Sequence, residues 1–216
     1  MPPPMESLGR EQEFVIKRYS ECDLSQIDMK KLKEKFKEAP HKNLEIRDLT
    51  QLLEAKVNQM VHQNSERQSF AERLQRILDD YNAGSQTSQE SMDELLRFMS
   101  ELTEEQQRAH REGLTEQELE IYDMLLKPKL SKKDEQQVKL AAKDLLEKLE
   151  KRQSELFPLQ WHQNNQKKKQ VFVFVGNELN QTLPQTYDND VFVEKKEKIY
   201  SALLMRGDAV TQMFAE

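Results

Sequence analysis

The sequence predicts an all-α fold, a bundle of long antiparallel amphipathic helices joined by short loops, and three observations support this class. Charged residues make up 33% of the 216 residues and apolar residues only 36%, a balance typical of helices with wide solvated faces. Five glycines and seven prolines leave long stretches without a helix breaker. Apolar residues recur at spacings of three and four along most of the chain. A doubly wound α/β core is disfavoured because it needs continuous apolar strands and more glycine.

Composition also limits the setting and the partners of the protein. The formal net charge of −6 argues against a chain that coats nucleic acid over its whole surface, although it is compatible with a local basic patch. A single cysteine, Cys22, excludes an internal disulfide framework and fits a reducing compartment. No apolar run approaches the roughly 20 residues that span a bilayer, and the start of the chain lacks a signal-peptide pattern. We therefore expect a cytoplasmic protein with no membrane association.

The chain is expected to have three consecutive parts. Residues 1–45 form a linker with short helices, residues 46–157 form the core of the bundle, and residues 158–216 form C-terminal helices that close it. In the first part, apolar spacing predicts short helices over residues 11–19 and 28–38. Because the loops between the helices are short, neighbouring helices should pack antiparallel.

The bundle core is expected to begin with a helix that Asp48 caps, with an apolar stripe from Leu49 to Val61. Apolar spacing then predicts a second helix over residues 70–81. Gly84 follows it closely, and a glycine in this place is typical of a helix that ends with a left-handed residue.

The third helix of the core is expected to start at Ser88 and to run to Glu112. Its apolar face ends at Leu102, and the residues beyond are almost all polar. A polar helix end of this kind either projects into solvent or serves a partner. The candidate partner surface consists of Glu104, Glu105, Arg108, His110 and Arg111.

Gly113 is expected to end that helix. Thr115 and Glu118 then form a capping box, in which the hydroxyl and the carboxylate each satisfy a free backbone N–H group. Ser131 with Asp134 resembles a second cap, and apolar spacing predicts a long helix from there toward Phe157.

The last third of the chain is less clearly patterned. Residues 171–175 alternate valine and phenylalanine, a composition typical of a buried strand, but the residues before them are compatible with a helix. Periodicity does not decide a run this short, so strand and helix both stay open. A final helix is expected over residues 194–205, and residues after Gly207 should fray. Trp161 is expected to anchor the core where helices turn.

Two groups of lysines are candidates for contact with DNA phosphates. They are Lys30, Lys31 and Lys33, within the lysine-rich run Lys30–Lys37, and the consecutive Lys167, Lys168 and Lys169. A solvated helix face is the preferred interpretation of the first group, because no aromatic or arginine platform interleaves its lysines. The same interpretation is preferred for the second group, as a solvated turn.

No residue pattern predicts catalysis, a bound cofactor or a metal site. The five glycines are too far apart for a phosphate loop, and the four histidines lie on separate segments. Asp188, Asp190 and Glu194 imitate part of a metal-dependent nuclease motif, whose lysine would be Lys196. However, Glu194 and Lys196 begin a helix, where residues two apart diverge. We therefore expect a non-catalytic helical interaction module.

Three segments resemble the C-terminal helical region of the R (restriction) subunit of type I restriction enzymes. They are residues 70–73, residues 78–84 and, above all, the run Arg111-Glu112-Gly113-Leu114-Thr115-Glu116-Gln117-Glu118-Leu119 with Tyr122-Asp123. Trp161 also falls where that region has a tryptophan before another helix. The resemblance covers residues 46–126 well and residues 131–205 more weakly, and it does not extend through residues 1–43.

The resemblance implies an architecture and a role. In this family the R subunit carries a nuclease domain and two ATP-driven translocase lobes, and the helical region docks this motor onto the methyltransferase core of M and S subunits. By this resemblance, ATP and Mg²⁺ would be used in the parent subunit, and no catalytic residue carries over to this chain. The chain would reach DNA through the assembled complex. Residues 1–45 would lead from the motor region. Residues 171–175 would be helical and buried on all sides. The alternative is a module that contacts DNA directly through Lys30–Lys37 or Lys167–Lys169.

Overall fold

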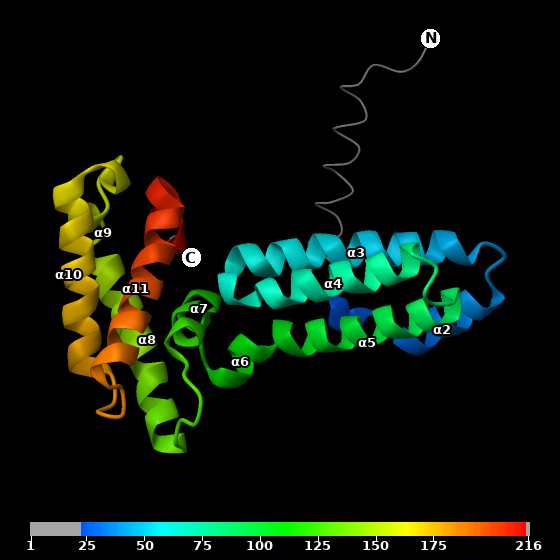
Figure 1. Cartoon of the computed structure of the whole chain (residues 1–216), viewed down its shortest axis with the longest axis horizontal. Helices are drawn as coiled ribbons and strands as arrows, with labels where there is room; N and C mark the ends of the chain where they lie inside the picture. The colour runs from blue at the N-terminus through cyan, green and yellow to red at the C-terminus, as the bar shows by residue number, and fades with distance from the viewer. Residues whose placement is uncertain (1–22, 215–216) are drawn as a thin grey trace, which may run out of the picture. The chain divides into compact units, whose positions relative to one another are not determined.

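A computed structural model describes residues 23–214, and the regular secondary structure of these residues is exclusively helical, as predicted (Figure 1). The expected helix over residues 11–19 and the single cysteine lie outside the described residues. Packing divides the chain into two compact units, with the division between Arg111 and Glu112. None of the described helices is both long enough and apolar enough to cross a membrane.

The first unit is built around three long helices that run beside one another (Figure 1). Their facing sides bury a continuous apolar core that includes Leu53, Met92, Leu95 and Phe98, all with 0% exposure. Burial of apolar area on this scale is the main source of stability for amphipathic helices. The elements are η1 (Leu24–Gln26), α2 (Met29–Glu38), α3 (Lys42–Gln63), η2 (Ser65–Arg67), α4 (Gln68–Asn82), α5 (Ser88–Gln106) and α6 (Arg108–Glu112).

Helix α3 starts earlier than predicted. It begins at Lys42, with His41 at the N-cap position making no side-chain cap bond, and Asp48 lies inside the helix rather than capping it. The reason is that Pro40 ends α2 and no residue between positions 42 and 48 disfavours a helix, so the helix restarts at once. By contrast, the Asp28 carboxylate caps α2 by accepting hydrogen bonds from two backbone N–H groups.

The second unit closes a separate core. Helices α7 and α8 pack on one another, and so do α10 and α11. The two pairs are joined because α8 packs on α10 and α7 packs on α11. The predicted capping box is confirmed, since Thr115 Oγ1 accepts from the Glu118 backbone at 3.1 Å and Glu118 Oε2 accepts from the Thr115 backbone at 2.8 Å. The elements are α7 (Glu116–Leu125), α8 (Lys132–Lys151), α9 (Gln153–Leu156), η3 (Trp161–Gln163), α10 (Asn165–Thr182), α11 (Asn189–Arg206) and η4 (Gly207–Phe214).

The valine and phenylalanine run is helical and lies within α10. Val171, Phe174 and Val175 are buried, because the helical repeat puts them on the face that meets α8 and α11. Val173 is on the other side and is 47% exposed. The expectation that this run would be buried on all sides is therefore wrong, and the helix has an inner and an outer face like its neighbours.

The segment after Gly207 is also ordered, against the expectation that it would fray. Trp161 is completely buried, and its indole Nε1 donates a hydrogen bond to the Gly207 carbonyl at 2.8 Å. Val210, in η4, is 0% exposed, and the Phe214 ring stacks on Phe157 with centroids 6.0 Å apart. Trp161 is thus the core anchor that the sequence predicts, and it ties the end of the chain to the second unit.

The division into two units falls elsewhere than the expected boundaries of the parts at residues 45 and 157. Helix α8 packs on α7 and on α10, so residues on both sides of position 157 share one core. Periodicity identifies the apolar side of a helix but not the helix that covers it, and this is why the grouping did not follow from the sequence.

Tyr187 links the loop before α11 to the end of α7. Its hydroxyl donates a hydrogen bond to the Leu125 carbonyl at 2.7 Å. Burial, and secondarily the carboxylate of Asp134, raises the pKa of Tyr187 to about 12. Because the folded-state pKa is raised, the neutral hydroxyl stabilises the fold fully below the unfolded pKa of about 10, and this contribution is lost as the pH rises through the folded value.

The Tyr187→Phe variant is expected to lose stability less steeply than the parent between about pH 10 and pH 12, since it has no hydroxyl to ionise. Urea unfolding followed by Trp161 fluorescence over this range measures the effect. Tyr81→Phe, which removes an exposed hydroxyl bonded to Asn43 in the first unit, is the control and should keep the parent slope. Equal slopes for Tyr187→Phe and the parent would contradict the prediction.

Candidate functional site

The polar segment beyond Leu102 is not a single straight helix. Helix α5 ends at Gln106 and α6 begins at Arg108, with Gln107 between them at φ −88° and ψ −3°. The predicted continuous helix to Glu112 is therefore wrong in this detail. The apolar stripe that holds α5 on its neighbours ends at Leu102, so packing no longer imposes one helical axis beyond it.

A buried arginine organises this end of the first unit. The side chain of Arg67, from η2, is 3% exposed, and its Nε lies 2.8 Å from Glu105 Oε1. The other carboxylate oxygen of Glu105 lies 3.2 Å from Arg108 Nε. Glu105 thus joins two guanidinium groups, one before α4 and one in α6. Nothing in the sequence spacing around Arg67 indicates a buried cation.

The five candidate partner residues divide into two sets. Glu105 and Arg108 face the unit and take part in its own ion pairs. Glu104, His110 and Arg111 are exposed. The second set offers one carboxylate, one imidazole and one guanidinium on a base fixed by the first set, an arrangement suited to recognition by charged hydrogen bonds.

The lysines of α2 are partly neutralised within the first unit. Lys33 Nζ lies 2.8 Å from Asp93, which lowers the pKa of that carboxyl, and Lys31 lies 3.8 Å from Asp28. Lys30 is exposed. These three side chains therefore do not form one uniform cationic surface for DNA.

In the second unit, Lys167 has a structural role. Its Nζ donates to the Glu155 carbonyl at 2.9 Å and to Gln170 Oε1 at 3.1 Å, so it joins α10 to α9. Lys168 is partly exposed and Lys169 is exposed. The two groups of lysines belong to different units, and each contributes only part of its charge to solvent.

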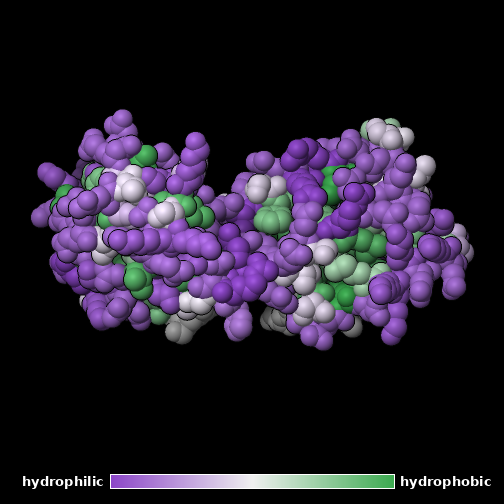
Figure 2. Space-filling view, turned by 90° about the horizontal axis from the view of Figure 1, so that it is seen from below, coloured by the Kyte–Doolittle hydropathy of each residue, from purple (hydrophilic) through white to green (hydrophobic). Residues whose placement is uncertain are grey.

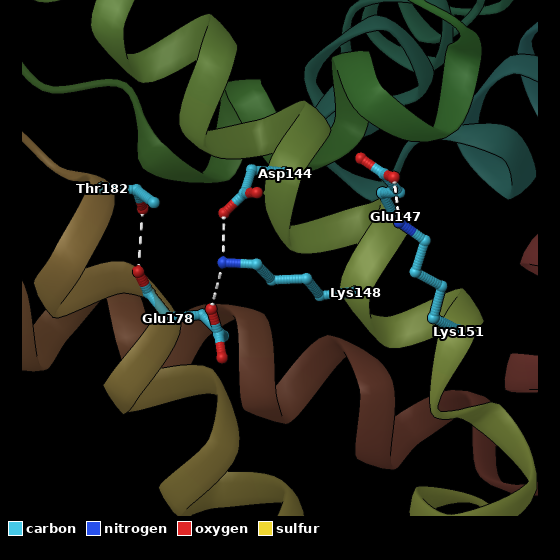
Figure 3. Close-up of polar contacts among 6 residues, drawn as sticks. All are labelled: Asp144, Glu147, Lys148, Lys151, Glu178 and Thr182. Atoms are coloured by element: carbon cyan, nitrogen blue, oxygen red, sulfur yellow. Dashed lines mark hydrogen bonds and ion pairs between the residues drawn. The ribbon is translucent and has the colours of Figure 1, made fainter.

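Ion pairs also cover the outer surface of the second unit. Figure 3 shows Lys148 of α8 between Asp144, at 2.8 Å, and Glu178 of α10, at 2.6 Å. These two carboxylates, Asp144 first, raise the pKa of Lys148 to about 12. The same view shows the exposed pair formed by Glu147 and Lys151. Figure 2 shows one face of the molecule, on which hydrophilic side chains predominate and hydrophobic side chains form patches between them.

The nuclease-like residues do not converge. Asp188 caps α11 by accepting from the Val191 backbone at 2.9 Å, and Glu194 pairs with the adjacent Lys195. Within residues 23–214 no three histidine, cysteine or acidic side chains are placed to hold a metal ion. The geometry thus offers surfaces for binding, and the chemistry available at them is ion pairing and hydrogen bonding.

Together the fold and these surfaces define a class, an all-helical module with two closed cores and ion-paired outer faces. The family model described as type I restriction enzyme HindI endonuclease subunit-like, C-terminal, matches residues 14–205. The chain therefore belongs to this family, and the match reaches further toward the N-terminus than the motifs that carry the resemblance. No curated protein and no solved structure matched the sequence.

Proposed function

We propose that this chain is a non-catalytic docking module of a type I restriction enzyme R subunit. In this proposal it attaches the ATP-dependent DNA translocase and endonuclease to the methyltransferase core of M and S subunits. ATP and Mg²⁺ are used by the motor part of the parent subunit, in the cytoplasm, and DNA is reached through the assembled complex. Membership of the C-terminal family supports the role in the R subunit.

The observation that carries the docking role is the end of the first unit. The Arg67–Glu105–Arg108 ion pairs fix the base of this end, and Glu104, His110 and Arg111 stand exposed on it. Side chains on a fixed base lose less conformational freedom when they bind, so they bind more tightly for the same contacts. Charged groups of both signs also select a partner of complementary pattern.

The test is a pull-down of the purified chain with M and S subunits, with a charge-exchanged variant, Glu104→Lys with Arg111→Glu. This variant keeps the net charge and should bind at least about tenfold more weakly, or about 1.4 kcal/mol. The matched control is Glu147→Lys with Lys151→Glu, which exchanges an exposed pair on α8 and should bind as the parent does. Absence of parent binding at micromolar concentration, or equal loss in both variants, would contradict the proposal.

Direct DNA contact through Lys30–Lys37 or Lys167–Lys169 is the competing proposal. The structure gives it less support, because Lys33 and Lys167 are held by contacts within their own units. A salt titration of duplex binding by the variant K30Q/K37Q/K169Q tests this competing proposal, since phosphate contacts weaken steeply with salt and loss of these contacts would reduce the slope.

A further inference from the structure

The loop before α8 and the first turn of α8 carry lysines that the described part of the protein does not neutralise. Four lysines occur in the seven residues from Lys127 to Lys133. Lys129, Lys132 and Lys133 are exposed, and their ammonium groups make no ion pair, hydrogen bond or ring contact with residues 23–214. Elsewhere on α8 the cations are paired, as Lys148 and Lys151 show. Residues 127–133 are therefore a local concentration of positive charge on an acidic chain.

This loop is fixed in place by the rest of the second unit. Lys127 Nζ donates to the Thr186 carbonyl and lies 4.6 Å from the centroid of the Tyr187 ring. Gln137, one turn into α8, donates to the Thr182 carbonyl at 3.1 Å. Lys129 has φ 63°, a left-handed conformation that a non-glycine residue keeps only when its surroundings impose it. The three exposed ammonium groups thus project from a rigid base.

Two acidic residues, Asp134 and Glu135, also lie in the first turn of α8, and both interact with other residues of the second unit. Glu135 accepts a hydrogen bond from the Tyr122 hydroxyl at 3.2 Å and lies 3.7 Å from Lys139. Asp134 lies near Tyr187, whose pKa it helps to raise. The loop also precedes a helix of 20 residues, whose N-terminal end bears a partial positive charge. The exposed lysines and the N-terminal end of α8 therefore both contribute positive charge at this place.

We propose that Lys129, Lys132 and Lys133, with the N-terminal end of α8, bind the phosphate backbone of a nucleic acid duplex. Backbone contacts in such complexes come mainly from cationic side chains and helix N-termini. A protein partner fits less well because protein interfaces have an apolar centre. In the described residues the nearest mainly exposed large apolar side chain along the sequence is Leu140, about two turns further along α8. The site is independent of the docking proposal and of the two lysine groups considered above.

The test measures binding of the whole chain to a short DNA duplex at several salt concentrations. Each lysine–phosphate contact contributes about 0.9 to the slope of log K against log salt. The variant K129N/K132Q/K133Q should therefore bind more weakly, with a slope smaller by about 2.7. Asparagine is used at position 129 because it tolerates the left-handed conformation. The matched control K30Q/K37Q/K169Q removes the same charge from exposed lysines elsewhere and should keep the parent slope.

The outcomes are separable. Equal weakening in both variants would show attraction to overall charge and would overturn the site, as would absence of duplex binding by the parent. Loss of M and S subunit binding in K129N/K132Q/K133Q, with duplex binding intact, would show that the loop contacts protein and would also overturn it. Circular dichroism confirms that both variants fold. Duplex binding and the pull-down with M and S subunits are measured separately. The docking proposal can therefore fail while the proposal of a duplex-binding site stands, and the reverse is also possible.

Discussion

Replacing Arg206 by alanine is expected to destabilise the second unit by about 3–5 kcal/mol. Arg206, at the end of α11, donates to Glu120 of α7 at 2.6 Å, and the side chain of Glu120 is only 1% exposed. Arg206→Ala removes this cation from a carboxylate that cannot move into water, which costs more than the intact pair contributes. Trp161 is the only tryptophan and lies in the same unit, so its fluorescence during urea unfolding reports the change.

Two further variants make this result specific. Lys151→Ala removes a cation of similar size from the exposed pair with Glu147 and should cost less than about 1 kcal/mol. Replacing Glu120 and Arg206 together by leucine should restore most of the lost stability, because neither charge is then buried. If Arg206→Ala destabilises no more than Lys151→Ala, the buried pair is not a major source of stability for the second unit.

Glu105→Ala is expected to destabilise the first unit by a similar amount, about 3–5 kcal/mol. The carboxylate of Glu105 is the partner of the buried Arg67 and of Arg108, so its removal withdraws an anion from two guanidinium groups at once. Helical circular dichroism in urea should show an earlier transition for the first unit. Trp161 lies in the other unit, so its fluorescence transition should change less.

The control for this variant lies one turn earlier on the same helix. Glu101 pairs with Arg73 at the surface, where both side chains are about half exposed, and Glu101→Ala should cost less than about 1 kcal/mol. Similar losses for Glu101→Ala and Glu105→Ala would show that burial of Arg67 does not decide the stability of this end of the unit.

Local signals predicted much of the fold. The capping box at Thr115 and the helix stop at Gly84, which has φ 70°, are confirmed because each depends on residues a few positions apart. The predicted start of α3 was wrong because residues 42–48 continue the helix without needing the cap at Asp48. The prediction that the chain frays after Gly207 was wrong because this segment is held by distant packing, as the bond from Trp161 to Gly207 shows. The grouping of helices into two units depends on packing in the same way.

The candidate partner surface was located by elimination, as polar residues that the apolar pattern left unexplained. The sequence pattern does not distinguish Glu105 from Glu104, although Glu105 pairs with a buried arginine and Glu104 is exposed to solvent. Arg67 and Glu105 are 38 residues apart, and Glu120 and Arg206 are 86 apart. Spacing along one helix carries no information about partners at such distances, so neither pair could be predicted from the sequence.

The helical state of α10 has a consequence for the unfolded chain. Residues 171–175 alternate valine and phenylalanine, the composition that most favours stacking of strands from different molecules into amyloid-like aggregates. Folding prevents this, because Val171, Phe174 and Val175 are buried in a helix whose backbone groups are already bonded. Lys167, Lys168 and Lys169 immediately precede the run, where charged residues act as gatekeepers that oppose aggregation. The stability of the second unit thus also protects the protein from self-association.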